Sequence, residues 1–221
     1  MPVVLITPEE MLHKETPYTE MLCEAGFEIH YPQDPTFTRG LCSEQATIEQ
    51  LGMCDAVIAG GECFTKNVIE ALPRLRVIAR SGVGYDRVDV TTATERGIPV
   101  TITPTANFDA VAEHTLGLLF AVAKSVVAFD RSARTDWSRW LTMPVRGATL
   151  GLLGLGRIGC AVATRAKALG MTVIAVEPYP NQQFVAEHGI KLVDQDTLLA
   201  NSDYLSVHCP LTADTQGMID Q

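Results

Sequence analysis

The most informative chemical signal in the sequence is a glycine turn at residues 154–159, Gly-Leu-Gly-Arg-Ile-Gly. It has the spacing G-x-G-x-x-G, follows an apolar run at Leu150–Leu153 and precedes a segment of helical periodicity. In that context Gly154 permits a tight turn, Gly156 lets the backbone approach a pyrophosphate, and Gly159 lets the helix pack closely on the strand. The helix start adds free N–H groups and a positive dipole end. The segment predicts a dinucleotide site; the alternative is a turn whose glycines serve geometry alone.

An acidic residue stands at the end of the next predicted strand. Glu177 directly follows Thr172–Val176, and a carboxylate there can accept hydrogen bonds from both hydroxyls of an adenosine ribose. Its negative charge repels a 2′-phosphate. The predicted cofactor is therefore NAD in preference to NADP.

The six cysteines show no spacing typical of a metal site or of a redox-active pair. None belongs to a CxxC pair, and no Cys/His cluster has zinc spacing. Most lie inside apolar patterns, where a free cysteine behaves as a small hydrophobic residue. We expect reduced, buried thiols and no metal at Cys23, Cys42, Cys54, Cys63, Cys160 and Cys209.

Predicted strands and helices alternate along the chain, which is typical of an α/β protein with parallel sheets. Apolar runs such as Val3–Ile6 are separated by segments of helical periodicity, with Thr65 as a candidate helix cap and Gly97 just past a helix end. The pattern changes near residue 104. We expect a first lobe over residues 1–103 and a second over residues 104–221.

The segment from Phe108 to about Arg134 is long and mostly apolar, and it predicts one continuous helix. Because apolar residues occur on all its faces, we expect burial on most of them, between two lobes or between subunits. Hydropathy alone would also permit a membrane span, but Glu113, His114 and Lys124 make that interpretation costly.

The net charge and the N-terminal sequence indicate which kinds of partner the protein is not expected to have. The formal net charge of −9 disfavours nucleic acid, because an acidic chain repels phosphate backbones. The N-terminus lacks the basic start and cleavage site of a signal peptide. We expect a cytoplasmic protein with no membrane partner.

Three segments resemble the D-isomer-specific 2-hydroxyacid dehydrogenase family, in that family's order and with similar spacing. ARSGVGYDRVD at 79–89 looks like its substrate loop, TPTAN at 103–107 with AVAEH at 110–114 like its domain crossover, and DYLSVHCPLT at 203–212 like its fourth cofactor-lobe strand. The resemblance implies two Rossmann-like lobes with parallel sheets. The first is a flavodoxin-like substrate-binding lobe and the second an NAD-binding lobe.

The resemblance also implies roles for individual residues. Backbone amides of Val83 and Gly84 would hold the substrate carboxylate, as successive amides of a glycine turn can. Asn107 would lie at the hinge near the substrate, and Val83 would also border the nicotinamide. The remaining cofactor contacts implied are Gly154, Gly156, Arg157, Ile158, Gly159, Glu177, His208, Cys209, Pro210 and Thr215.

The family's catalytic Arg, its Glu or Asp and its His would all follow Gln221, so no catalytic residue is predicted within this chain. His114 and His208 are expected to serve as core and lining residues, and Arg80 as a strand-end residue pointing away from the substrate loop. The second lobe is therefore expected to be incomplete, and the chain to be a truncated product or a partial sequence that is inactive as it stands.

The predicted function is hydride transfer between NAD(H) and a small 2-hydroxy or 2-oxo acid, by a protein that forms a homodimer at full length. A phosphoglycerate dehydrogenase-like activity is favoured, although no phosphate-binding basic groups are evident in the first lobe. Hydroxypyruvate or glyoxylate reduction is the close alternative. Two non-enzymatic alternatives are a non-catalytic NAD-binding module and an inactive fragment.

Overall fold

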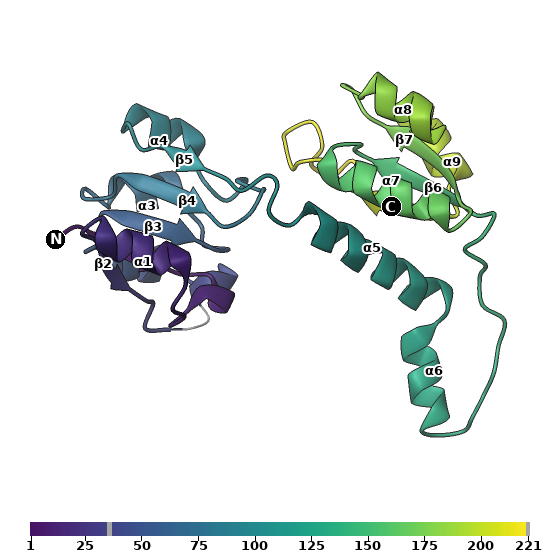
Figure 1. Cartoon of the computed structure of the whole chain (residues 1–221), viewed down its shortest axis with the longest axis horizontal. Coiled ribbons are helices and arrows are strands. Elements are labelled where there is room, and N and C mark those ends of the chain that lie inside the picture. The colour runs from purple at the N-terminus through teal and green to yellow at the C-terminus, as the bar shows by residue number, and fades with distance from the viewer. Residues whose placement is uncertain (35–36, 220–221) are drawn as a thin grey trace. The chain divides into compact units, whose positions relative to one another are not determined.

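Short apolar strands alternate with helices along both halves of the chain (Figure 1). The computed structural model describes residues 1–34 and 37–219. Two compact units emerge, Met1–Ala106 and Asn107–Gln221, so the division lies just after the boundary predicted from sequence. Both units carry a parallel sheet, as the α/β pattern predicts.

The sheet of the first unit has the strand order β2-β1-β3-β4-β5, which is the flavodoxin-like order. β1 is buried along its whole length, as expected for a parallel strand covered on both faces. Thr65 caps α3 by accepting a hydrogen bond from the Val68 amide, and Gly97 follows α4 with a positive φ, as predicted. The strands are β1 Val3–Ile6, β2 Glu28–His30, β3 Ala56–Ala59, β4 Val77–Arg80 and β5 Val100–Thr101; the helices are α1 Pro17–Glu24, α2 Glu44–Leu51, α3 Lys66–Glu70 and α4 Val90–Glu95, with short 3-10 turns at Glu9–Met11 and Phe37–Arg39.

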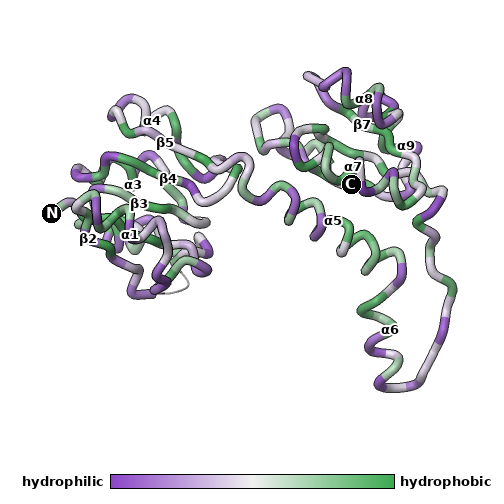
Figure 2. Tube along the Cα trace, in the orientation of Figure 1, coloured by the Kyte–Doolittle hydropathy of each residue, from purple (hydrophilic) through white to green (hydrophobic). Residues whose placement is uncertain are grey.

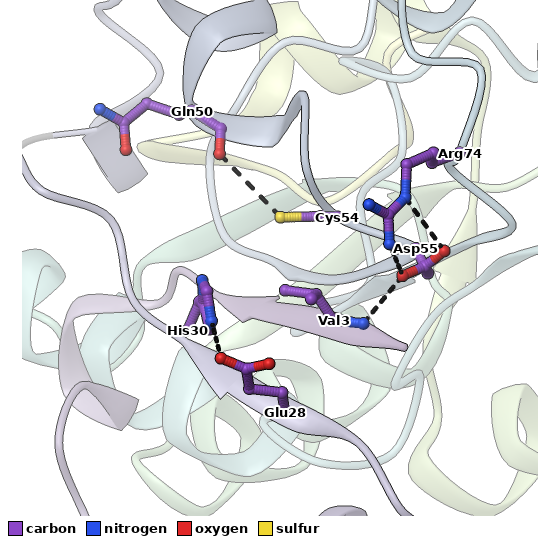
Figure 3. Close-up of polar contacts among 7 residues, drawn as sticks. All are labelled: Val3, Glu28, His30, Gln50, Cys54, Asp55 and Arg74. Carbon is purple, nitrogen blue, oxygen red and sulfur yellow. Dashed lines mark hydrogen bonds and ion pairs between the residues drawn. The ribbon is translucent and has the colours of Figure 1, made fainter. Parts of the chain in front are cut away.

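A polar contact ties together the amino ends of β1 and β3 (Figure 3). The Asp55 carboxylate accepts hydrogen bonds from the Val3 amide at 2.8 Å and from Arg74 at 2.7 Å. The hydrogen bond from Arg74, followed by that from Val3, lowers the pKa of Asp55. This contact fixes the edge of the sheet opposite to the one where the strands end.

The second unit has a four-stranded parallel sheet of order β8-β7-β6-β9. β6 lies at the centre, pairing with β7 on one side and β9 on the other, which is the 3-2-1-4 arrangement of a dinucleotide-binding half. The strands are β6 Thr149–Leu153, β7 Thr172–Val176, β8 Lys191–Leu192 and β9 Tyr204–Val207; the helices are α5 Phe108–Ala123, α6 Val126–Ala133, α7 Arg157–Ala168, α8 Gln182–His188 and α9 Gln195–Asn201.

Alternating side chains of this sheet pack into two separate hydrophobic cores. Val173 and Ala175 belong to the larger core, which α5 and α7 also line, whereas Ile174 packs with Leu198 of α9. Because successive residues of a strand face opposite sides, the two cores lie on opposite faces of the sheet. The central strands β6 and β7 are thus covered on both faces.

The prediction of one continuous helix from Phe108 to about Arg134 is wrong. α5 ends at Ala123, and α6 begins at Val126 after a bend of 54°. Ser125 between them has φ +50°, in the left-handed region that breaks the helical hydrogen-bond ladder. The break divides the apolar segment into two short helices.

The burial predicted for this apolar segment, between two lobes or between subunits, stays a prediction, because the second unit by itself does not supply it. Figure 2 shows hydrophobic residues along α5 and α6, and many of them are exposed. Among the described residues no single helix is long and apolar enough to cross a membrane, although α5 and α6 taken together pass that test by length and composition. The exposed apolar residues of α5, α6 and the segment that follows α6 are Leu118, Phe120, Val122, Val126, Val127, Trp137, Trp140, Leu141 and Met143.

All six cysteines are free, as predicted, but only Cys54 is buried. Burial raises the pKa of its thiol to about 11, so it stays protonated near neutral pH. Cys23 is exposed and the other four are half-buried, so the prediction of buried thiols is wrong for most of them. No group of three or more His, Cys, Asp or Glu side chains with metal-binding geometry occurs in residues 1–34 and 37–219.

Candidate functional site

The glycine turn connects the end of the central strand β6 to the start of α7. Gly154 has φ +98°, and a Cβ atom there would lie 2.6 Å from the Cys209 amide nitrogen. At Gly159 a Cβ atom would collide with the carbonyl oxygen of Gly154. Both glycines are therefore required by the fold itself, because the chain after β9 and the first turn of α7 pass too close for any side chain.

Gly156 differs from these two glycines. A Cβ atom built there meets nothing within 4 Å, and the residue has an ordinary extended conformation, with φ −73° and ψ −160°. Neither packing nor backbone strain within the unit requires glycine at this place. The open space in front of Gly156 is the feature that a group approaching the backbone would use.

The amino end of α7 faces the same space. Gly156 is its N-cap and supplies no side-chain hydrogen bond, and the first N–H groups of a helix have no partner within the helix. Arg157 is exposed and Ile158 half-buried at this end. The turn thus combines free amides and a positive dipole end, a combination suited to phosphate.

Glu177 lies at the end of β7, beside the turn. One of its oxygens accepts a hydrogen bond from the Leu155 amide at 2.8 Å, and the other from the Tyr179 amide at 3.0 Å. The sequence predicts an acid here but not this contact with the turn, which depends on the register of β6 and β7. The carboxylate is half-buried, so it both braces the turn and presents charge at the strand ends.

The chain after β9 supplies the third side of this site. The His208 side chain lies 2.9 Å from the Ser206 hydroxyl, and burial lowers the pKa of its imidazole. A neutral ring is therefore favoured, as expected for a residue that lines a pocket. Cys209 lies against Gly154, and Pro210 follows it on the exposed side.

The Thr215 hydroxyl is already engaged. It donates to the Pro210 carbonyl at 2.6 Å and accepts from the Thr212 amide at 2.8 Å. These bonds close the loop after β9 on itself. The cofactor contact predicted for Thr215 stays a prediction, and the role that the structure gives it is to shape this loop.

The predicted substrate loop follows β4 in the first unit. Within the described residues the backbone amides of Val83 and Gly84 donate no hydrogen bond, and Gly84 is exposed. The flanks of the loop are tied down: the Ser81 amide donates to the Ala59 carbonyl and the Thr103 amide to the Gly82 carbonyl, both at 2.9 Å. Two free amides on a fixed turn can receive a carboxylate.

Arg80 does not point away from this loop, so that expectation is wrong. Its Nε donates to the Gly84 carbonyl at 3.0 Å. Behind it lies Glu62, an acid that sequence reasoning missed entirely and that is 1% exposed. No local pattern marks Glu62, because its burial depends on how three parallel strands come together.

Asn107 caps α5 without a side-chain hydrogen bond and belongs to the second unit, whereas Val83 and Gly84 belong to the first. The structure thus gathers the predicted cofactor residues at one edge of the second sheet. It gathers the predicted carboxylate-binding amides at one edge of the first sheet.

Several known proteins are similar to this chain. The profile of the family described as D-isomer specific 2-hydroxyacid dehydrogenase, NAD binding domain, matches residues 116–221. A D-3-phosphoglycerate dehydrogenase of Archaeoglobus fulgidus is 39% identical over 181 residues, covering 80% of this chain and 34% of that protein. A glyoxylate reductase of Korarchaeum cryptofilum is 39% identical over 202 residues, covering 88% of this chain and 61% of that protein.

Solved structures give the same result. An NAD-dependent formate dehydrogenase from Staphylococcus aureus, in complex with NAD, has a TM-score of 0.79 and 26% identity, covering 100% of this chain and 68% of that one. The chain spans 34% and 61% of the length of the two curated relatives.

Proposed function

Because the chain belongs to the D-isomer specific 2-hydroxyacid dehydrogenase family, whose members are NAD-dependent enzymes, we propose that it serves hydride transfer between NAD(H) and a small 2-hydroxy or 2-oxo acid. NAD supplies the hydride-accepting or hydride-donating ring when bound. The residues of this chain bind and orient the two reactants, which lowers the entropic barrier to their reaction.

The open space at Gly156 is the observation that carries the proposal. Glycine there serves no packing need of the unit, yet it leaves the backbone accessible beside the free amides of α7. Arg157 and Ile158 would flank the pyrophosphate, and Glu177 would accept hydrogen bonds from the adenosine ribose. The chain after β9, with His208 and Pro210, would border the adenine.

The substrate side rests on the loop after β4. The amides of Val83 and Gly84 would hold the carboxylate of the 2-oxo acid, so that its carbonyl carbon is presented for hydride transfer. Phosphohydroxypyruvate and hydroxypyruvate or glyoxylate are the candidate substrates. Relatives named for phosphoglycerate and for glyoxylate both support the shared 2-oxo acid group.

The test is NADH oxidation by the protein that carries this sequence, followed at 340 nm with glyoxylate, hydroxypyruvate and 3-phosphohydroxypyruvate in turn. We expect NADH to bind and at least one 2-oxo acid to be reduced. NADH binding without turnover of any 2-oxo acid would favour a non-catalytic NAD-binding module. Absence of NADH binding would contradict the proposal.

We also propose that the protein works as a homodimer in the cytoplasm. The apolar surface of α5, α6 and residues 137–143 supports the dimer, since apolar patches of this kind mark protein interfaces. A cavity of about 190 Å³ beside Phe129 and Trp137 adds a recess in that surface. The free cysteines are in keeping with a reducing compartment.

A further inference from the structure

A buried polar group lies beneath the loop that we propose to bind the substrate carboxylate. Thr7 follows β1, Glu62 follows β3 and Arg80 ends β4. These three strands are neighbours in the first sheet, and Ala59 pairs with Arg80 in register. Their carboxyl ends therefore bring the three side chains to one edge, under residues 81–85.

The Glu62 carboxylate is the unusual member of this group. Its residue is 1% exposed, and neither of its oxygens has a hydrogen-bond partner of normal geometry in the described part of the chain. One oxygen lies 3.5 Å from the position that a Cβ atom would have at Gly60, so the absence of a side chain there makes room for it. A buried carboxylate without a partner is costly, and such groups persist where they serve a purpose.

Arg80 supplies a positive charge and hydrogen-bond donors near the Glu62 carboxylate. Burial raises the pKa of Glu62, whereas polar contacts with the Thr7 side chain and with the Glu62 and Gly60 backbones, followed by the charge of Arg80, lower it. The NH1 group of Arg80 is itself buried and has no hydrogen-bond partner among residues 1–34 and 37–219. No Glu62–Arg80 ion pair within 4.0 Å occurs among the described residues, so the leftover donor and acceptor would be joined by a small side-chain rotation or by one bridging water.

The other side of the guanidinium holds the loop. Arg80 Nε donates to the Gly84 carbonyl at 3.0 Å, which fixes the peptide plane that follows the Val83 and Gly84 amides. A guanidinium can do this because its planar fork donates in two directions at once. Arg80 therefore connects a buried acid to the backbone of the carboxylate-binding turn.

We propose that Glu62 is a positioning residue for the substrate: its buried carboxylate holds the Arg80 guanidinium, which fixes the Gly84 carbonyl and with it the amides that receive the substrate carboxylate. The inference rests on the proposed function, because that function gives the loop its ligand.

The test is a double-mutant cycle with Glu62→Gln, Arg80→Met and the double variant, alongside Glu70→Gln as a control at an exposed acid of the same unit. The first readout is amide hydrogen exchange at Thr103 and Val88, whose N–H groups donate to the loop carbonyls of Gly82 and Tyr85. The second readout is the affinity for oxamate, an inert 2-oxo acid mimic, in the presence of NADH.

We expect each single variant to speed exchange at Thr103 and Val88 about tenfold and to weaken oxamate binding about tenfold, with NADH affinity unchanged. The double variant should be no worse than either single one, and Glu70→Gln should match the wild type. Unchanged exchange in Glu62→Gln, or fully additive effects in the double variant, would overturn the proposal.

Arg80→Lys keeps the inference testable if Glu62→Gln does not fold. Lysine retains the charge beside Glu62 but lacks the second donor direction toward Gly84, so the loop should loosen while the unit stays folded. Wild-type exchange rates in Arg80→Lys would contradict the proposal. Failure of the wild type to bind oxamate would instead contradict the proposed function, and the exchange data would still decide whether Glu62 holds the loop.

Discussion

At the scale of single residues, the three glycines of the turn at residues 154–159 are required for different reasons. Gly154 and Gly159 are held by contacts within the unit, whereas Gly156 faces open space. Glu177 adds a carboxylate that braces the turn through the Leu155 amide. Stability and cofactor binding should therefore respond separately to changes at neighbouring positions.

Gly156→Ala should leave the free energy of unfolding within about 0.5 kcal/mol of the wild type, because the methyl group enters open space at an ordinary φ. NADH affinity should fall at least roughly tenfold, since the methyl group blocks approach to the backbone. Gly159→Ala is the matched control and should lose about 1–3 kcal/mol of stability through overpacking. Urea unfolding and NADH fluorescence measure the two effects; equal destabilisation by both variants would contradict this account.

Glu177→Gln should change cofactor choice while keeping one of the two backbone hydrogen bonds that Glu177 accepts. Glutamine keeps one of the two backbone hydrogen bonds through its amide oxygen and loses the other, because its NH2 group cannot accept, and the charge that repels a 2′-phosphate is removed. We expect the ratio of NADH to NADPH affinity to fall about tenfold, a change typical of removing one like-charge contact. Titration with both cofactors checks this, and an unchanged ratio would assign discrimination to another residue.

At the scale of elements, some parts were predictable from sequence and others were not. The β6 strand, the turn and α7 could be predicted because apolar runs, glycine spacing and helical periodicity are local signals. The break between α5 and α6 could not, because Lys124 and Ser125 are neither proline nor glycine. The burial of Glu62 and the orientation of the Arg80 side chain toward the substrate loop depend on contacts between strands distant in sequence. No local sequence pattern indicates such contacts.

Ser125→Gly should stabilise the connection between α5 and α6. Ser125 has φ +50°, which costs a residue with a Cβ atom about 1 kcal/mol and glycine almost nothing. We expect a gain of about 0.5–1 kcal/mol in the free energy of unfolding, measured by urea denaturation. A loss of stability would mean that the two helices form one continuous helix in solution.

At the scale of the whole molecule, the second unit leaves many apolar side chains exposed within itself. Leu141 is 99% exposed, and Trp137 and Val122 are also largely exposed. Such a surface is unfavourable in water. The homodimer proposed above would cover it with a second copy of the same apolar elements.

Leu141→Glu should weaken self-association at least about tenfold by placing a charge in that surface, while leaving the fold intact. Leu211→Glu makes the same change at another exposed leucine, in the loop after β9, and should leave the oligomeric state unchanged. Sedimentation velocity across a concentration series distinguishes the two. A monomeric wild type, or an equal effect from both variants, would contradict the dimer.

We propose that the turn at residues 154–159 holds the pyrophosphate of NAD. The most direct measurement is an NMR titration of the isotope-labelled protein with NAD, following backbone amide shifts. We expect saturable shifts of the Gly156, Arg157 and Ile158 amides, and a shift of the Leu155 amide, which donates to Glu177, with the same dissociation constant. Saturation with those amides unmoved, or no binding at all, would contradict it.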